Sequence, residues 1–353
     1  MNREERLQRI NAELAQRILI LDGSMGAYLQ GFGLTNNDFH GLRFAEHPMS
    51  LKGDTDLLTL TQPDIITKVH QAYIDAGADI ISTNTFTANP ISQAEYALEE
   101  VVREMNLESA ILARAACDAA EARDGRPRAV AGAIGPTTKL LSMSPDVGDP
   151  GRRDADFESM AKGYEEQILG LIEGGADILL IETITDTLNA KSALWAAWEA
   201  FDKTGVELPL WISGTITDRS GRTLSGQTVE AFYNSVRHAR PWAVGLNCAL
   251  GPADMRQFLA DLARVAECPV SAYPNAGLPN AMGGYDETAH SMETHYAEWA
   301  RAGLLNIAGG CCGTTPEHIT HMKHAVENVA PRAIPPRDAR LKLAGLEPFN
   351  AAA

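Results

Sequence analysis

The segment Ala76-Gly77-Ala78-Asp79-Ile80-Ile81 returns later in the chain as Gly174-Gly175-Ala176-Asp177-Ile178-Leu179, and more loosely as Ala302-Gly303-Leu304-Leu305. In each copy a glycine precedes a short apolar run. This is the pattern of a helix that ends at a left-handed glycine and leads into a strand. The repeat therefore predicts that helices and strands alternate along the chain.

Eight short apolar runs follow this pattern, and each ends in a polar or glycine-rich turn. Continuous apolar runs of this length are typical of parallel strands that are buried on both faces. The expected strands cover residues 17–21, 78–82, 129–134, 176–181, 208–213, 243–247, 269–273 and 304–308.

Helices are expected between these strands. Thr61-Gln62-Pro63-Asp64 is a typical start for a helix over 65–76, and Thr315-Pro316-Glu317 is one for a helix that reaches Asn328. Eight strand–helix units with right-handed crossovers close most simply into an α/β fold, a (β/α)8 barrel of the TIM type. The alternative is an open doubly wound sheet, but its usual G-x-G-x-x-G turn is absent after the first strand.

The barrel is expected to occupy residues 1–330, including an N-terminal helix. Residues 331–353 contain Pro331, Pro335-Pro336 and Pro348 and end in three alanines. Prolines at this density favour extended chain over a packed unit. We therefore expect a C-terminal tail or linker rather than a second domain.

The composition excludes several classes of partner. The chain has 353 residues, of which 45% are hydrophobic and 22% are charged, and its formal net charge is −16. Without a basic run, neither nucleic acid nor a membrane surface is an expected partner. The first residues lack the apolar core of a signal peptide, and no apolar run is long enough to span a bilayer. We therefore expect a cytoplasmic protein.

Three of the five cysteines follow predicted strands: Cys248 comes after the sixth, and Cys311-Cys312 after the eighth. Residues that follow the strands of a barrel converge on one rim, so these thiols can meet. Neighbouring Gly309, Gly310 and Gly313 give the backbone freedom to turn both adjacent side chains toward one ion. Three thiolates suit zinc and leave one position of its tetrahedral shell for a substrate.

Other metal-binding residue types are interpreted differently. Cys117, in an alanine-rich helix, and Cys268, before Pro269, are expected to be inert buried side chains. His318, His321 and His324 stand three residues apart on the last helix. Steps of three spread the side chains around a helix, so we expect a solvated face rather than a shared ion.

Two carboxylates, Asp22 and Glu182, follow otherwise apolar strands and are expected at the same rim. A buried acid there needs a cationic partner, and a substrate ammonium group is the functional candidate. The alternative is that each carboxylate caps a loop by accepting backbone N–H groups. The sequence contains no nucleophile elbow, Walker loop or H-E-x-x-H motif.

Several motifs resemble the homocysteine-binding domain of cobalamin-dependent methionine synthase, and the resemblance covers nearly the whole chain. The Asn-Cys and Gly-Gly-Cys-Cys motifs are shared by all homocysteine methyltransferases, so they specify the chemistry strongly and the methyl donor weakly. The matching segments begin at Leu21-Asp22-Gly23-Ser24-Met25-Gly26, Lys52-Gly53-Asp54, Gly245-Leu246-Asn247-Cys248, Tyr273-Pro274-Asn275 and Gly309-Gly310-Cys311-Cys312-Gly313.

The resemblance implies a barrel whose zinc is bound by Cys248, Cys311 and Cys312 and takes the homocysteine sulfur as its fourth ligand. It also implies that the amino-acid end of homocysteine is received by Asp22, Glu182, Thr83 and the backbone around Gly132, Ala133 and Ile134. Asn275 resembles the group that can occupy zinc when substrate is absent.

The family enzyme continues into folate-binding, cobalamin-binding and reactivation regions, whereas this sequence stops soon after Leu346-Glu347-Pro348 and lacks the cobalamin signature D-x-H-x-x-G. The expectation is an excised module or a subunit that receives methylcobalamin on a separate methionine synthase component. One alternative is a self-sufficient methyltransferase that uses S-methylmethionine or betaine. Another is a non-catalytic homocysteine-binding or assembly subunit.

Overall fold

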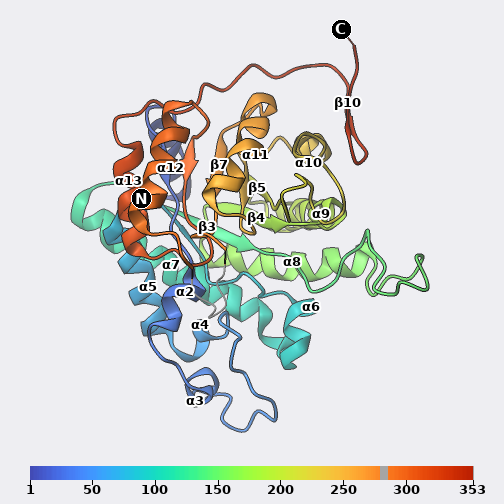
Figure 1. Ribbon diagram of the computed structural model, residues 1–353. Coiled ribbons are helices and arrows are strands. Elements are labelled where there is room, and N and C mark those ends of the chain that lie inside the picture. The colour runs from blue at the N-terminus through green and yellow to red at the C-terminus, as the bar shows by residue number, and fades with distance from the viewer. Residues whose placement is uncertain (279–284, 353) are drawn as a thin grey trace.

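A computed structural model describes residues 1–278 and 285–352 and shows a (β/α)8 barrel of the TIM type (Figure 1). Eight parallel strands lie in the order β1-β8-β7-β6-β5-β4-β3-β2, and a single bridge between Leu21 and Ile80 joins the two ends of the sheet. All eight predicted strands are confirmed. They are β1 (Leu19–Ile20), β2 (Ile80–Ser82), β3 (Ala129–Ile134), β4 (Ile178–Ile184), β5 (Leu210–Gly214), β6 (Ala243–Asn247), β7 (Val270–Tyr273) and β8 (Ile307–Ala308).

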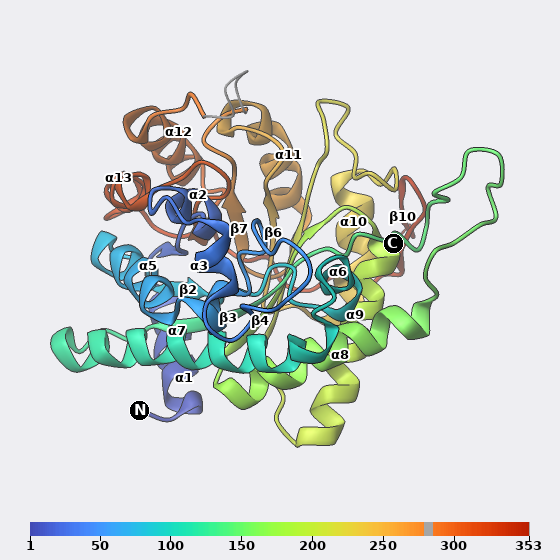
Figure 2. The same ribbon diagram turned by 90° about the horizontal axis from the view of Figure 1, so that it is seen from below.

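Helices surround the strands on the outside (Figure 2). Both predicted helices are confirmed as α5 (Pro63–Ala76) and α13 (Pro316–Val326). The other long helices are α7 (Val102–Asp124), α8 (Phe157–Gly174), α9 (Thr187–Thr204), α10 (Val229–Val236), α11 (Pro252–Val265) and α12 (Ala289–Arg301). Shorter elements in the connections are α2 (Met25–Gln30), α3 (Asn36–His40), α4 (Leu58–Thr61), α6 (Pro90–Gln93) and the 3-10 turns Ala94–Tyr96, Glu99–Val101 and Arg237–Ala239.

The glycines of the sequence repeat end helices as predicted. Gly77 follows α5 with a φ of 108°, and Gly175 follows α8 with a φ of 98°. These left-handed conformations cost little without a Cβ. Each glycine turns the chain from the outer helix back into the barrel wall.

The barrel interior is filled by alternate side chains of the strands. Trp211 is its largest fully buried member, and its indole donates to Ser271 Oγ over 2.9 Å. Gly245 on the intervening strand leaves the necessary room, because a Cβ there would overlap Ser271. Leu19, Ile80, Ala131, Ile178, Leu180 and Ile307 also belong to this inner cluster.

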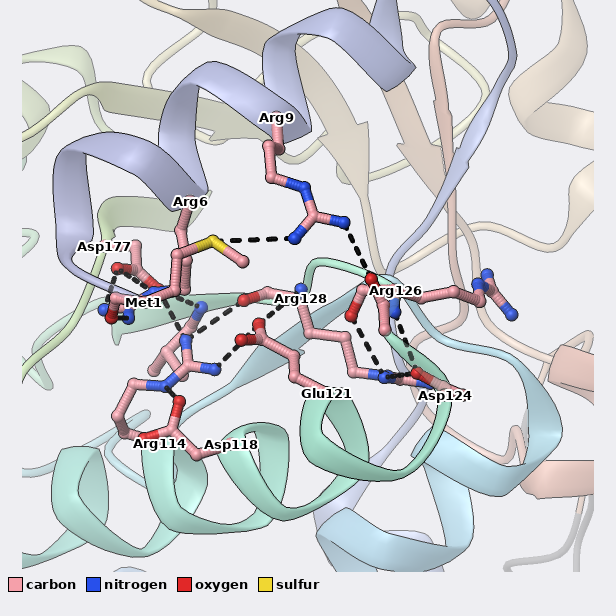
Figure 3. Close-up of polar contacts among 12 residues, drawn as sticks. Met1, Arg6, Arg9, Arg114, Asp118, Glu121, Asp124, Arg126, Arg128 and Asp177 are labelled. Carbon is pink, nitrogen blue, oxygen red and sulfur yellow. Dashed lines mark hydrogen bonds and ion pairs between the residues drawn. The ribbon is translucent and has the colours of Figure 1, made fainter.

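The N-terminal helix α1 (Arg3–Leu14) closes the end of the barrel where the strands begin. Its Ile10 and Leu14 join the inner apolar cluster. Its Arg6 pairs with the buried Asp177 over 2.9 Å, and Asp177 also pairs with Arg114 of α7 over 2.9 Å (Figure 3). The aspartate of the sequence repeat therefore fastens α1 to the barrel.

The C-terminal segment contains a structure that the sequence analysis did not predict. Its first part is extended, and Arg332 is buried where it donates to the carbonyls of Ala263 and Cys268. Strands β9 (Lys342–Ala344) and β10 (Pro348–Asn350) then form an antiparallel hairpin. The hairpin is held to α10 in part by Asn234, which donates to the Leu343 carbonyl. Across the described residues, no helix has the length and apolar character needed to cross a membrane.

Candidate active site

The three predicted cysteines meet at the rim formed by the carboxyl ends of the strands. The Cys312 Sγ lies 3.9 Å from the Sγ of Cys248 and 3.9 Å from that of Cys311. All three sulfur atoms lie within 4.8 Å of one another, and none forms a disulfide. A tetrahedral zinc ion with bonds of about 2.3 Å places its sulfur ligands about 3.8 Å apart. The spacing of the thiols therefore fits a single zinc ion.

The backbone conformation that gathers these thiols differs in part from the expectation. Gly313 has a positive φ of 81°, but Gly309 and Gly310 do not. These two glycines are needed for space, because a Cβ on Gly309 would lie 2.7 Å from the Leu21 Cβ. Cys248 itself is left-handed, with a φ of 59°. Such strain at a non-glycine residue is concentrated at functional sites.

The electrostatics of the thiols favour a bound cation. Hydrogen bonds from Cys248 and Cys311 lower the pKa of Cys312 to about 3. The corresponding contacts with Cys248 and Cys312, together with burial, raise the pKa of Cys311 well above its ordinary value. The cluster thus holds one thiolate readily, whereas three thiolates need a positive ion between them.

A cavity of about 250 Å³ opens beside the thiols. Sites for drug-sized ligands are typically roughly 300–1,000 Å³, so this cavity suits a ligand of amino-acid size. Among the described residues that line it, none is Lys, Arg or His. Its lining includes the predicted site residues Asp22, Thr83, Ala133, Glu182, Cys248, Cys311 and Cys312.

Asp22 lies at the end of β1 and is buried. Its carboxylate accepts the backbone N–H of Ser82 over 2.8 Å and the Ser82 hydroxyl over 2.9 Å. Burial nevertheless raises the pKa of Asp22 to about 7. Asp22 therefore does cap a backbone N–H group, as the alternative interpretation predicted. Its carboxylate still lacks a cationic partner among the residues that line the cavity.

Glu182 enters the cavity from a bulge in β4, where the register with β5 shifts between Ile181 and Ile184. Thr183 in this bulge is left-handed, with a φ of 56°. Asn247 holds it by accepting the Thr183 N–H over 3.1 Å and donating to the Thr183 hydroxyl over 2.7 Å. The asparagine before Cys248 thus positions the segment that carries Glu182. Burial raises the pKa of Glu182 to about 8.

Thr83 and the strand beside it make contacts within the protein. The Thr83 hydroxyl accepts the N–H of Ala133 over 2.9 Å, and the Ala133 carbonyl accepts from Thr85 and Gln167. Gly132 and Ile134 do not line the cavity. A Cβ on Gly132 would contact Leu171 of α8, which shows that Gly132 faces outward. The backbone groups of Ala133 are therefore already paired.

Asn275 follows β7 and is buried outside the residues that line the cavity. Its backbone N–H donates to the Leu250 carbonyl, next to the Cys248 turn. Its side-chain oxygen is buried and has no hydrogen-bond partner in the described part of the chain. Asn275 thus retains an unused acceptor near the thiols.

Three further residues of the cavity were missed by the sequence analysis. Ser82 anchors Asp22, and Tyr273 ends β7 with a buried hydroxyl beside Glu182. Burial and the charge of Glu182 raise the pKa of Tyr273 well above its ordinary value. Asp56 also lines the cavity, and burial raises its pKa to about 7. Two of the three had a signal in the sequence, since Tyr273 begins the quoted Tyr273-Pro274-Asn275 segment and Asp56 lies next to the quoted Lys52-Gly53-Asp54 motif.

The predictions for the remaining cysteines and histidines have mixed outcomes. Cys117 and Cys268 are buried, as predicted, and burial raises the pKa of each to about 12. The prediction of a solvated histidine face is wrong for His318, which is buried between Thr315 and the Glu287 carbonyl. Its burial results from the capping box at the start of α13.

A larger cavity, of about 690 Å³, lies at the opposite end of the barrel. Much of its charged lining is already paired, since Asp79 binds both Arg17 and Arg126 over distances of 2.8–2.9 Å. Catalytic groups of TIM barrels lie at the carboxyl ends of the strands. The smaller cavity beside the cysteines is therefore the candidate active site.

Residues 19–326 match the sequence model of a family described as homocysteine S-methyltransferase. The chain belongs to this family. The predicted resemblance is thus confirmed at the family level, and membership supports methyl transfer to homocysteine. The cysteine cluster and its cavity lie within the matched range.

Solved structures of a homocysteine methyltransferase, MmuM from Escherichia coli, show the same fold. Its oxidized form has a TM-score of 0.69 and 22% identity, over 90% of this chain and 99% of that chain. Its metallated form has a TM-score of 0.67 and 23% identity, with the same coverage. At this identity the likeness shows the (β/α)8 fold alone.

Proposed function

We propose that this chain binds one zinc ion through Cys248, Cys311 and Cys312 and transfers a methyl group to the thiolate of homocysteine to form methionine. The observation that carries the proposal is the position of three sulfur atoms, at a spacing that fits one zinc ion, beside a cavity that is also lined by the acids Asp22, Asp56 and Glu182. The donor set suits zinc, and family membership supplies the substrate. When bound, zinc lowers the pKa of a thiol ligand, so the substrate sulfur is a thiolate at neutral pH.

The protein's own groups then orient the substrate. The ammonium group of homocysteine supplies the positive charge that Asp22 and Glu182 lack, and its arrival favours their ionised forms. This arrangement fixes the amino-acid end while the sulfur reaches the cysteine cluster. In the transfer, the new S–C bond forms with the electron pair of the thiolate, and the bond between methyl and donor breaks with its electrons leaving on the donor. No proton has to move.

We propose methylcobalamin, carried by a cobalamin-binding partner, as the methyl donor. Two observations support it: the motifs of the sequence resemble cobalamin-dependent methionine synthase more closely than its relatives, and the cavity volume of about 250 Å³ suits a single amino-acid ligand. The donor then approaches from the mouth of the barrel. Folate-binding components would serve the partner and not this cavity.

A self-sufficient methyltransferase with a small donor is the second candidate. One observation favours it: the alignment with the homocysteine methyltransferase MmuM of E. coli covers 90% of this chain and 99% of that chain. The two candidates share the zinc and homocysteine sites and differ only in the donor.

The test compares donors with the purified, zinc-loaded chain and homocysteine. We expect methionine to form from methylcobalamin and to disappear in Cys312→Ser, while Cys117→Ser keeps the activity. Methionine formed from S-methylmethionine or betaine without any corrinoid would overturn the proposed donor. Homocysteine binding without zinc-dependent turnover from any of the three donors would instead show a non-catalytic binding subunit.

A further inference from the structure

A second group of metal-ligating side chains lies on the outer helices. His290 and Glu293 belong to α12, and His321 belongs to α13. The Glu293 Oε2 lies 2.6 Å from the His321 Nδ1 and 3.6 Å from the His290 Nδ1. One ligand atom from each of the three residues lies within 4.8 Å of the other two. None of the three lines the cavity beside the cysteines.

We propose that His290, Glu293 and His321 form a second, peripheral site for one divalent transition-metal ion, with zinc as the expected occupant. Two imidazole nitrogens and one carboxylate oxygen are ligands that zinc accepts in proteins. Water can fill the fourth position, because the side chain of His290 is 85% exposed and those of Glu293 and His321 are about one-third exposed. The site does not depend on the function proposed above.

The geometry requires only small changes to accept the ion. Metal–ligand bonds of about 2.0–2.1 Å in a tetrahedron place neighbouring ligand atoms about 3.4 Å apart. The separation of 3.6 Å between His290 and Glu293 is close to this value, and that of 2.6 Å between Glu293 and His321 must open by less than 1 Å. His290 and Glu293 share a helix face because they are three residues apart. The remaining adjustment falls on Glu293 and His321, whose side chains are both partly exposed.

An ion pair between Glu293 and His321 alone would not explain why His290 also lies close to the same carboxylate. The Nδ1 atoms of both histidines lie nearest to the Oε2 of Glu293, and the two ring centroids are 6.4 Å apart. These three ligands converge from two helices, whereas the regularly spaced His318, His321 and His324 form no such group within the described residues. The convergence distinguishes this cluster from the histidine row that the sequence suggested.

The place of the cluster in the fold suggests what an ion would do there. Helix α13 begins just after the Cys311-Cys312 turn, and α12 begins after the segment that follows β7. The two helices are already joined near their starts, where the His318 Nε2 lies 3.1 Å from the Glu287 carbonyl. An ion on His290, Glu293 and His321 would add a second connection. We therefore expect it to stabilise the helix pair and to take no part in methyl transfer.

The test uses tag-free, metal-stripped protein titrated with Co²⁺ and, separately, with Zn²⁺. The wild-type chain should bind two equivalents of metal, and His290→Ala and Glu293→Gln should each bind one. His290 is exposed, so its removal leaves the fold intact, and His295→Ala on the same helix is the matched control that should still bind two. The cobalt spectrum separates the sites, because the thiolate site has sulfur-to-cobalt charge-transfer absorption and the peripheral site has none.

Two results would overturn the proposal. The first is a wild-type chain whose only bound cobalt shows the thiolate absorption. The second is an unchanged number of equivalents in both His290→Ala and Glu293→Gln. Cys312→Ser should lose the thiolate absorption but still bind one equivalent of cobalt that lacks this absorption. Loss of metal at the cysteine cluster can therefore be distinguished from loss of metal at the peripheral site.

Discussion

The Sγ atoms of Cys311 and Cys312, neighbours in the chain, lie 3.9 Å apart at the end of β8. The side chains of adjacent residues rarely point toward the same position. Those of Cys311 and Cys312 do so because the turn at Gly313 is left-handed and Gly309 lets the chain pass close to Leu21. Cys248 completes the group from β6 through a strained turn of its own. The fold thus builds a three-thiol cluster from two strand ends.

Replacing one thiol should abolish metal binding at this cluster. Cys312→Ser removes the sulfur that lies 3.9 Å from both others, so the cluster loses a ligand and the remaining thiols stay protonated. We expect loss of the thiolate-bound zinc, measured by elemental analysis, and loss of methionine formation. Cys117→Ser, at a buried position in α7, should retain both. Full zinc content at the cluster in Cys312→Ser would contradict the ligand assignment.

Asp22→Asn should weaken homocysteine binding without displacing the metal. The change keeps the shape of the side chain but removes the negative charge that would face the substrate ammonium group. Hydrogen bonds to charged groups contribute about 1.5–3 kcal/mol, so we expect KM for homocysteine to rise roughly 10- to 100-fold. Isothermal titration would measure the affinity and elemental analysis the zinc. An unchanged KM would place the ammonium group elsewhere.

Glu182 should make stability depend on pH. Its pKa is about 8 in the folded protein because of burial, so the folded state holds a proton that the unfolded chain releases near its ordinary value of 4.5. Stability contributed by this proton is present at low pH and is lost as the pH rises toward 8. Glu182→Gln removes that dependence. In chemical denaturation, the variant should gain on the order of 4 kcal/mol over wild type between pH 5 and pH 9. Parallel pH profiles would exclude a buried protonated Glu182.

Asp177 should be important for the stability of the fold rather than for catalysis. Asp177→Ala leaves the buried Arg6 and Arg114 without their shared carboxylate, and broken buried ion pairs cost about 3–5 kcal/mol. The control is Glu173→Ala, which breaks an exposed pair with Arg103 and should cost less than about 1 kcal/mol. Both free energies of unfolding come from denaturant titration. Equal effects of the two substitutions would show that α1 is not fastened by Asp177.

The barrel could be predicted because its strands are continuous apolar runs ended by turns, a pattern that local sequence carries. The cysteines could be placed at one rim for the same reason, since Cys248 and Cys311 each follow such a run. The hairpin of β9 and β10 could not be predicted, because its contacts with α10 join segments that are distant in sequence.

The details of the cavity also depend on long-range contacts. The pairing of the Ala133 N–H with Thr83, the burial of His318 against Glu287, and the position of the Tyr273 hydroxyl beside Glu182 have no local signature. The left-handed conformation of Cys248 could not be predicted either, because cysteine has no preference for a positive φ. Sequence therefore indicated which residue types gather at the rim, and the structure was needed to show which of their polar groups remain available.

The most direct test of the central claim is X-ray absorption at the zinc edge, with one equivalent of zinc, before and after homocysteine is added. The account predicts three sulfur neighbours at about 2.3 Å in the free protein and four in the complex. Fewer than three sulfur neighbours in the free protein, or a number that does not increase when homocysteine binds, would contradict it.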